Sequence, residues 1–441
     1  MMKSFIGGVH PDDGKIYAKD KPIESPALPE QVVIPMSQHF GAPCKPVVKV
    51  GDHVKKGQLI GTSDAFLHAD IHASISGDVV KVAPMPHPMS VTDMAVVIKS
   101  DGLDEWVDGL PLDRDWTKLE GKEIVDLIKQ AGVVGCGGAT FPAHVKLAPN
   151  KPVDTFIVNG AECEPYLTAD YRAMLECDAD LVTGVQICMQ ALGVKVGIIG
   201  IEDNKPDAVA HLQEAFKNVE GVTVEALPTK YPQGAEKTLI RATTGREVPP
   251  GGLPMDVGCV VSNVGTVLAI TDAVCRGIPF IQRITTVTGD CIAEPKNLRL
   301  RIGTPYQYAV DFCGGFSKQP DRVISGGPMM GMAQFNLEVP VTKGASGIVC
   351  LSPEKCEVGE ESPCIRCGRC VEACPMFLIP SQLSIFSERS AWEKCMEYGV
   401  MNCVECGSCV FTCPAKRNIV QHIRNAKAQV KALQAAAKAK K

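Results

Sequence analysis

Two stretches near the end of the chain read CIRCGRCVEACP at residues 364–375 and CVECGSCVFTCP at residues 403–414. Each has the spacing C-x-x-C-x-x-C-x-x-x-C-P, which wraps thiolates around a cubic [4Fe–4S] cluster. Thiolates also bind zinc, but a structural zinc site takes its four ligands in two pairs rather than in one tight row. The doubled pattern therefore predicts two iron–sulfur clusters and a path for single electrons. Structural zinc and a chance arrangement are the alternatives.

The ligands of the two predicted clusters are expected to cross between the two runs. In two-cluster ferredoxins the fourth cysteine of each run binds the cluster of the other run. We therefore expect one cluster on Cys364, Cys367, Cys370 and Cys413, and the other on Cys403, Cys406, Cys409 and Cys374. The segment between the runs, residues 376–402, is mostly helical in character. This favours an all-helical two-cluster ferredoxin domain over residues 355–415.

Composition limits the remaining possibilities. A chain of 441 residues is long enough for about three domains. The net charge of −5 argues against general nucleic-acid binding, and the aromatic content of 5% argues against a stacking platform for single strands. The first residues lack the apolar stretch of a signal peptide, so the cysteines outside the two runs are expected to be buried thiols of a cytosolic protein. The most apolar stretch, residues 257–270, is too short to span a bilayer.

The N-terminal part of the chain predicts an arm followed by a small barrel. Residues 1–30 are rich in Pro, Asp and Lys and are expected to form an extended arm. Residues 31–100 contain short β-runs and glycine turns, with VKVGDHVKKGQ at residues 48–58. This part resembles the barrel of lipoyl and biotinyl carrier domains, but the tip at residues 65–70 reads AFLHAD and lacks the carrier lysine. We therefore expect a docking or packing module rather than a swinging arm.

Two further patterns leave alternatives open. His68 and His72 lie four residues apart on an expected β-hairpin, where solvated turn histidines are the first interpretation and a metal site is the second. Residues 416–441 are expected to form a basic C-terminal helix, because eight Lys or Arg and no acidic residue occur there on an Ala-rich background. We expect a frayed, solvated tail. A helix that meets a partner or an anionic membrane surface is the alternative.

Between these ends, strands and helices alternate. Such alternation over residues 120–280 predicts a Rossmann-like parallel α/β sheet with right-handed crossovers. Residues 281–350 change to short strands and turns with one helix at 305–313, which predicts a small β-grasp module. Within the α/β domain we expect strands at 154–158, 194–200 and 222–226, and helices at 123–130, 177–192, 206–219, 235–242 and 266–276.

A glycine-rich loop, GCGGATFPAHVK at residues 135–146, precedes an expected helix start. Without Cβ atoms the backbone approaches a phosphate or a flat ring closely, and free N–H groups at a helix start bind anions. Lys146 adds a positive charge. Taken alone, the loop is also compatible with a simple tight turn.

Two more loops follow predicted strands of the same sheet. NGAECEP at residues 159–165 falls at the carboxyl edge of the sheet, where ligands bind. Its amide and carboxylates suit ribose hydroxyls and a nicotinamide amide, and an acidic solvated loop is the alternative. SNVGT at residues 262–266 opens a helix. Asn263 and Thr266 either reach the same ligand or cap that helix.

These loops resemble those of the FMN-binding subunit of respiratory complex I, including the turn YPQGAEK at residues 231–237. The chain departs from that pattern at Cys136, Thr140 and Ala235, where complex I has arginine, glycine and glutamate. A closer resemblance is to the RnfC family of the Rnf complex, the ion-translocating ferredoxin:NAD oxidoreductase. That family shares the opening GGVHP at residues 7–11, the lipoyl-like barrel, the β-grasp module and the doubled cysteine motif. The resemblance covers nearly the whole chain.

The resemblance implies site residues by analogy. Three residues, Glu164, Tyr231 and Glu236, would face the nicotinamide nucleotide. The implied FMN site consists of Gly135, Gly137, Gly138, Lys146, Asn159, Glu162, Asn263 and Thr266.

The implied function is conversion between paired and single electrons. NADH gives up a hydride, a [4Fe–4S] cluster takes one electron at a time, and a flavin does both. We therefore expect a peripheral NADH-oxidising or NAD-reducing subunit of a membrane ion-translocating complex, on the cytoplasmic face of the bacterial plasma membrane. Its partners would be ferredoxin and the other subunits. The alternatives are a flavin and iron–sulfur cobalamin reductase of a diol-utilising microcompartment, and a flavin-free electron-wire adapter.

Overall fold

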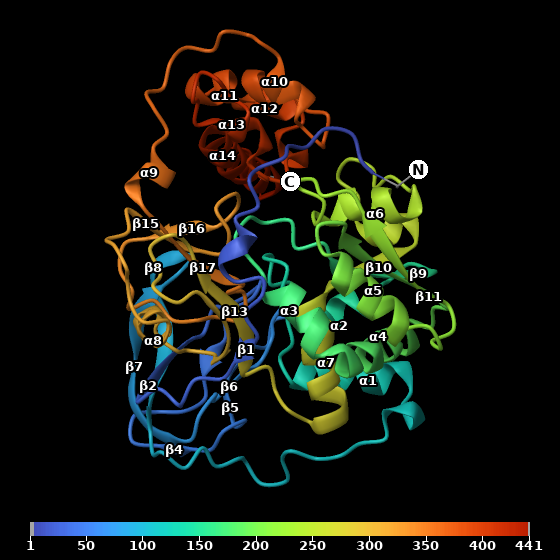
Figure 1. Cartoon of the computed structure of the whole chain (residues 1–441), viewed down its shortest axis with the longest axis vertical. Helices are drawn as coiled ribbons and strands as arrows, with labels where there is room; N and C mark the ends of the chain where they lie inside the picture. The colour runs from blue at the N-terminus through green and yellow to red at the C-terminus, as the bar shows by residue number, and fades with distance from the viewer. Residues whose placement is uncertain (1–3, 440–441) are drawn as a thin grey trace.

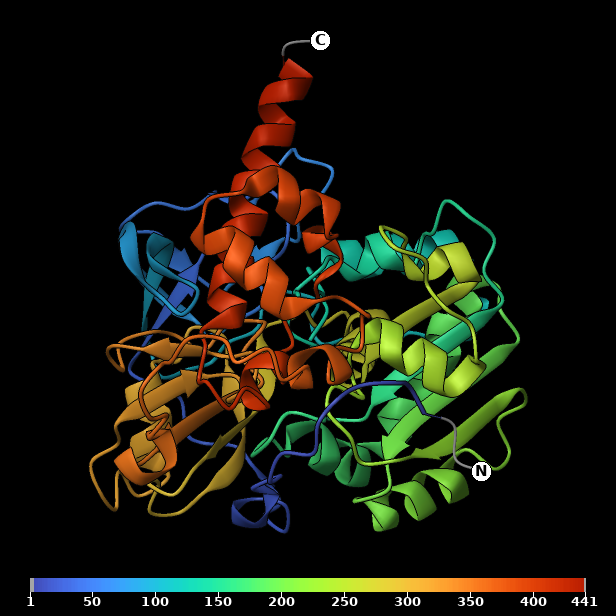
Figure 2. The same cartoon turned by 90° about the horizontal axis from the view of Figure 1, so that it is seen from above.

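The structure, a computed structural model, describes residues 4–439 and divides into four regions (Figures 1 and 2). The strands of residues 31–100, the barrel region, lie beside those of residues 281–350, the third region. The α/β domain, residues 120–280, lies on the other side of the molecule. The cluster domain, residues 355–439, sits above these parts in Figure 1.

A parallel sheet of four strands forms the centre of the α/β domain, as predicted. The strands follow the order β11-β10-β9-β12, with bounds β9 (Thr155–Gly160), β10 (Val196–Glu202), β11 (Val222–Leu227) and β12 (Cys259–Asn263). Successive side chains of a strand point to opposite faces. Phe156 and Val158 accordingly pack into one apolar cluster, and Ile157 packs into another on the opposite face.

Helices cover both faces of this sheet. They are η2 (Trp116–Lys118), α1 (Gly121–Gln130), α2 (Ala143–Lys146), α3 (Ala169–Glu176), α4 (Asp178–Leu192), α5 (Pro206–Ala215), α6 (Glu236–Thr244), η3 (Pro254–Val257) and α7 (Val264–Arg276). The face that carries Phe156 is covered by α1, α4 and α7, and the other face is covered by α6. The predicted helices all occur, although α5 ends at Ala215 rather than at residue 219. Helix α3 was not predicted.

The barrel region consists of two small antiparallel sheets, β2-β8-β7-β4 and β3-β5-β6. Their strands are β2 (Gln31–Pro35), β3 (Lys45–Pro46), β4 (His53–Val54), β5 (Leu59–Thr62), β6 (Ile71–His72), β7 (Gly77–His87) and β8 (Ser90–Ser100). Their inward side chains form one core that also includes Ile302 of the third region. The barrel region is therefore packed against its neighbour rather than tethered to it.

The expectation of solvated turn histidines in this region is wrong. His68 and His72 are 7% and 8% exposed. The reason is that the segment between them is covered by other regions. The Lys343 ammonium donates to the Asp70 carbonyl at 2.6 Å and to the Gly132 carbonyl at 2.7 Å.

The third region is a mixed sheet of six strands in the order β1-β14-β13-β17-β15-β16. Its elements are β1 (Ile23–Glu24), β13 (Gln282–Thr288), β14 (Lys296–Arg301), α8 (Tyr306–Phe312), β15 (Arg322–Ser325), β16 (Met332–Gln334), β17 (Gly347–Leu351) and α9 (Pro353–Cys356). Strand β1 comes from the N-terminal arm and pairs in parallel with β14. The arm also contains η1 (Lys15–Tyr17). It is thus partly built into this sheet rather than simply extended.

The cluster domain is helical, as predicted for residues 376–402. It contains α10 (Arg369–Glu372), α11 (Pro380–Glu388), α12 (Trp392–Glu397), η4 (Val400–Asn402), α13 (Ser408–Phe411) and α14 (Ile419–Ala439). The prediction of a solvated tail is wrong for the first half of α14, because Ile423 and Val430 are buried against α11 and α12. Residues 431–437 are exposed, as predicted. Figure 2 shows the end of α14 projecting from the body. Within residues 4–439, no helix is both long and apolar enough to cross a bilayer.

Candidate cofactor sites

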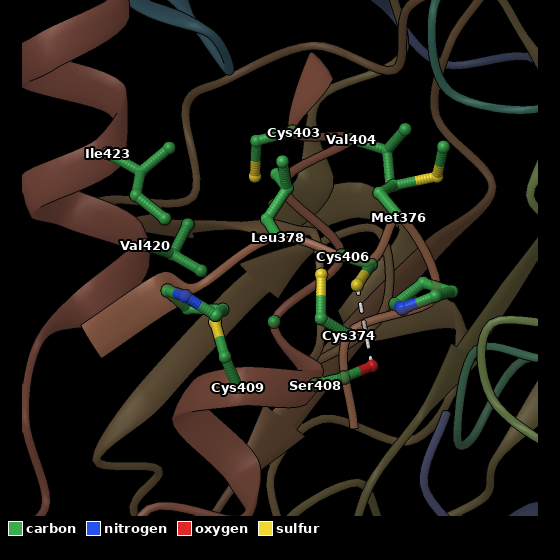
Figure 3. Close-up of a pocket in the computed structure, with 13 residues that line it drawn as sticks. Cys374, Met376, Leu378, Cys403, Val404, Cys406, Ser408, Cys409, Val420 and Ile423 are labelled. Carbon is green, nitrogen blue, oxygen red and sulfur yellow. Dashed lines mark hydrogen bonds between the residues drawn. The ribbon is translucent and has the colours of Figure 1, made fainter. Parts of the chain in front are cut away.

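Four of the eight predicted cluster ligands surround one pocket in the cluster domain. Cys374, Cys403, Cys406 and Cys409 line it together with apolar side chains that include Met376, Leu378, Val420 and Ile423 (Figure 3). This is the set expected for a single cluster if the ligands cross between the two runs. The structure brings these four together, and their role as ligands remains a prediction.

The chemistry of this pocket fits an iron–sulfur cluster. Burial raises the pKa of the Cys403 thiol to about 11, so loading of iron releases protons. The Glu405 N–H lies 3.3 Å from the Cys403 sulfur, as a donor to a thiolate would. The reduction potential of an iron–sulfur cluster depends on such hydrogen bonds and on burial.

Both cysteine runs have the same backbone turns. Arg366 and Gly368 have left-handed φ angles of 57° and 83°, and Glu405 and Gly407 have angles of 57° and 84°. In each run these left-handed residues flank the second cysteine and curl the chain around it. The repeat in sequence is therefore a repeat in structure.

The other four cysteines are less enclosed. Cys370 on α10 is buried, Cys364 and Cys413 are partly buried, and Cys367 is exposed. In the described part of the chain, no group of three or more His, Cys, Asp or Glu side chains is arranged to hold a single metal ion.

The predicted flavin loops meet at the carboxyl edge of the α/β sheet. Asn159 is the penultimate residue of β9 and Asn263 ends β12, and the two residues are register partners on adjacent parallel strands. The Asn159 side chain donates to the Gly234 carbonyl at 2.7 Å. Asn263 caps α7 by accepting from the Gly265 N–H at 2.8 Å, and it donates to Asp170 at 2.5 Å. Burial raises the pKa of Asp170 to about 6.

The glycine loop lies above this edge and is fixed at Cys136. The Cys136 N–H donates to the Thr266 hydroxyl at 2.8 Å, and its carbonyl accepts from the Arg283 guanidinium at 2.9 Å. The next residues, Gly137 to Ala139, are exposed. A Cβ at Gly137 would meet only Asn263, at 3.7 Å, and a Cβ at Gly138 would meet nothing within 4 Å.

The backbone at Gly137 gives no reason of its own for glycine, because its φ is not left-handed and no neighbour would clash. The open space above the loop is therefore available to a ligand that a side chain would displace. This observation fits the phosphate or the flat ring of FMN.

Lys146 and Glu236 form an ion pair at 2.6 Å, and both side chains are about one-third exposed. Sequence analysis assigned them to different ligands, the flavin and the nicotinamide nucleotide. In the structure, Lys146 and Glu236 contact each other at the start of α6.

Glu162 faces inward. Its carboxylate accepts from the backbone N–H groups of Asp170 and Tyr171, at 2.7 and 3.2 Å, at the start of α3. Its backbone carbonyl accepts from the buried ammonium of Lys15 at 2.9 Å. In the structure Glu162 therefore holds the loop that follows β9.

Glu164 and Tyr231 lie at the contact with the cluster domain. Tyr231 is 2% exposed, and its hydroxyl donates to the Cys406 carbonyl at 2.7 Å. The Glu164 carboxylate lies 3.4 Å from that hydroxyl and accepts from the Met329 N–H at 3.1 Å. Burial raises the pKa of Glu164 to about 7. Neither side chain lies on an open surface.

The N-terminal segment Gly7–Val9 runs between the cluster domain and the α/β domain (Figure 1). We call it the strap. Val9 exchanges two backbone hydrogen bonds with Tyr231, at 2.8 and 2.9 Å, and the Gly8 N–H donates to the Ala373 carbonyl at 2.8 Å. A Cβ at Gly7 would come within 2.9 Å of the Cys374 carbonyl.

Sequence analysis missed three buried cations that hold the candidate flavin loops. The Lys15 ammonium donates to the carbonyls of residues 162, 164 and 167. The Lys205 ammonium donates to the Ala161 carbonyl at 2.8 Å, and Arg283 holds Cys136. Their partners are distant in sequence, so no local motif marks them.

Comparison with known families assigns four parts of the chain. The Nuo51 FMN-binding domain matches residues 128–272, and the RnfC barrel sandwich hybrid domain matches residues 3–103. The SLBB domain matches residues 284–333, and the 4Fe-4S dicluster domain matches residues 363–417.

Relatives match the chain over nearly its full length. The corresponding subunit of the proton-translocating ferredoxin:NAD(+) oxidoreductase complex of Clostridium ljungdahlii is 58% identical, over 100% of this chain and 97% of that protein. The corresponding subunit of the Na(+)-translocating complex of Acetobacterium woodii is 48% identical, over 97% of each chain. Among solved structures, an NAD+-reducing [NiFe]-hydrogenase covers 74% of this chain and 66% of its own, with 20% identity and a TM-score of 0.48. With the coverage and identity of these two relatives, the chain belongs to the RnfC family of ion-translocating ferredoxin:NAD oxidoreductase complexes, the Rnf complexes.

Proposed function

We propose that this protein is the flavo-iron–sulfur subunit of an ion-translocating ferredoxin:NAD oxidoreductase complex and that it exchanges electrons with NADH. Bound FMN and two [4Fe–4S] clusters supply the conversion between a hydride and single electrons. One observation carries the proposal. The candidate flavin edge and a pocket of four cysteines occur in one chain and touch through Tyr231 and Cys406.

The chain's own residues bind and orient these groups. Exposed backbone at Gly137 and Gly138, which follow the half-buried Gly135, leaves room for FMN, and Lys146 supplies positive charge. Asn159, Glu162, Asn263 and Thr266 shape the edge beneath the loop. Tyr231 is buried, and the Glu164 carboxylate is engaged by the Tyr231 hydroxyl and the Met329 N–H. The Glu236 side chain is about one-third exposed and is therefore the more accessible carboxylate of the predicted nucleotide set.

The cluster ligands we propose are the eight cysteines of the two runs, crossed between them. The pocket on Cys374, Cys403, Cys406 and Cys409 supports this assignment, because it joins one cysteine of the first run to three of the second.

We infer the following division of the chain. An N-terminal arm (1–30) leads to a lipoyl-like barrel (31–100), which is followed by a Rossmann-like FMN and NADH domain (120–280). A β-grasp module (281–350), a helical two-cluster ferredoxin domain (355–415) and a basic helix (416–441) complete it. The sheet orders and the helical cluster domain support these finer assignments. We place the subunit peripherally on the cytoplasmic face of the membrane, with ferredoxin and the other subunits as partners.

Anaerobic purification tests this function directly. The holoprotein is expected to show both flavin and iron–sulfur absorbance, and NADH should bleach the flavin band rapidly. A preparation loaded with iron, sulfide and FMN that shows iron–sulfur absorbance alone and ignores NADH would favour the flavin-free adapter instead.

A further inference from the structure

The two predicted cluster sites have different surroundings. The pocket of Cys374, Cys403, Cys406 and Cys409 faces the α/β domain. Tyr231 of that domain donates to the Cys406 carbonyl at 2.7 Å, and a Cβ at Gly407 would come within 3.0 Å of the Met329 carbonyl. The strap reaches the same place, at Ala373. Three parts of the chain therefore close around this pocket.

Continuous packing leads from the pocket back to the flavin edge. Cys163, Tyr231 and Cys406 belong to one apolar cluster. The Cys163 sulfur accepts from the Gly234 N–H at 3.2 Å, and the Gly234 carbonyl accepts from the Asn159 side chain at 2.7 Å. Contacts between neighbouring atoms thus join the end of β9 to a predicted cluster ligand.

The other cysteine set is more exposed to solvent. Cys367 is exposed, and its neighbour Ile365 is 66% exposed. The hydrogen bond at the start of this run, from the Ser362 N–H to the Ala415 carbonyl, stays within the cluster domain. This set therefore lies on the outer side, where a partner has access.

We propose that Cys374, Cys403, Cys406 and Cys409 hold the flavin-side cluster and that Cys364, Cys367, Cys370 and Cys413 hold the partner-side cluster. Tyr231 is a positioning residue that fixes the flavin-side site against the α/β domain. This order of the two clusters, from the flavin to the partner, rests on the proposed function. Oxidation of one NADH to NAD+ releases two electrons and one proton. Bound FMN would accept this pair, and a cluster at each cysteine set would carry one electron at a time.

Single-ligand variants test the order. In Cys367→Ala, the flavin-side cluster should exchange electrons with NADH and NAD+ at the wild-type rate. In Cys403→Ala, the partner-side cluster should exchange electrons with NADH and NAD+ at least ~10-fold more slowly, because the flavin-side cluster that connects them is missing. Freeze-quench EPR gives these rates, starting from oxidised protein with NADH and from dithionite-reduced, desalted protein with NAD+. Electron transfer is measured in both directions, so the result does not depend on which cluster has the higher reduction potential.

An unchanged rate in Cys403→Ala, with its partner-side signal intact after dithionite, would overturn the order. Bleaching of the flavin by NADH is recorded in the same samples. If bleaching persists while the order fails, the proposed function stands without this inference. If bleaching is absent from the wild type, the function itself fails.

Tyr231→Phe tests the positioning role without removing a ligand. Loss of the hydroxyl should shift the midpoint potential of the flavin-side cluster and slow its electron exchange with NADH and NAD+ several-fold. Tyr308→Phe is the matched control, because its hydroxyl donates to the remote Ala27 carbonyl at 2.7 Å. Equal effects of the two variants on potential and rate would overturn the role of Tyr231.

Discussion

The cysteine pocket and the glycine loop are assembled in different ways. The pocket is made by short turns that recur in the two runs, with left-handed residues at 366 and 368 and again at 405 and 407. The glycine loop is held by Thr266 and Arg283, which are 130 and 147 residues away from Cys136. A local motif therefore specifies nearly all of its own site, whereas the flavin edge depends on the assembled fold.

The largest expected effect is at Gly137. A Gly137→Val change should reduce bound FMN from about one per chain to below about a tenth, because the new side chain occupies the open space above the loop. Iron content should not change, since the cysteine turns are independent of this loop. The flavin-to-protein ratio and iron content of anaerobically purified protein check both points. A fully flavinated variant would contradict the placement of FMN here.

A smaller effect is expected when the distant support of the loop is removed. Arg283 donates to the carbonyls of Cys136, Lys343 and Ala345 at 2.9, 2.7 and 2.6 Å. Arg283→Met removes these three hydrogen bonds, and among the described residues only the Ala345 carbonyl keeps another donor, the Thr285 hydroxyl at 3.0 Å. The change should lower the free energy of unfolding by about 3 kcal/mol. The Kd for FMN, measured by flavin fluorescence, should rise about ten-fold.

Arg322→Met is the control for this change, because Arg322 lies in the same region and is half exposed. If Arg283→Met binds FMN as tightly as the control does, the loop is rigid without its distant support, and the contrast with the cysteine pocket disappears.

The smallest expected effect is on the pH dependence of stability, and it comes from His72, which is buried where the barrel region meets its neighbours. Burial lowers the pKa of His72 to about 3, so the imidazole is neutral in the folded chain. The unfolded chain binds the extra proton below about pH 6.5, so stability falls as pH decreases through that value toward the folded pKa. The loss from His72 is about 1.4 kcal/mol per pH unit.

Thermal unfolding of the holoprotein between pH 7 and pH 5 measures this slope. His72→Gln should flatten it relative to wild type. The exposed His53 of the same region provides the control, His53→Gln, which should keep the wild-type slope. Identical slopes in all three proteins would show that the junction does not depend on a neutral His72.

The sequence predicted what local patterns determine. The strands and helices of the α/β domain other than α3, and the helices between the cysteine runs, follow from periodicity. The carboxyl edge follows from the order of strand and loop. The errors at His68, at His72 and in α14 share a cause, because each is buried by contacts with residues far away in the chain. Lys15 and Arg283 were missed for the same reason.

The strap has a consequence for how the molecule is made. Residues 7–9 are synthesised long before Tyr231 and Ala373, yet they close against both. Such distant contacts form late, because the intervening chain must first be ordered. The strap can therefore close only after the cluster domain has been synthesised and folded.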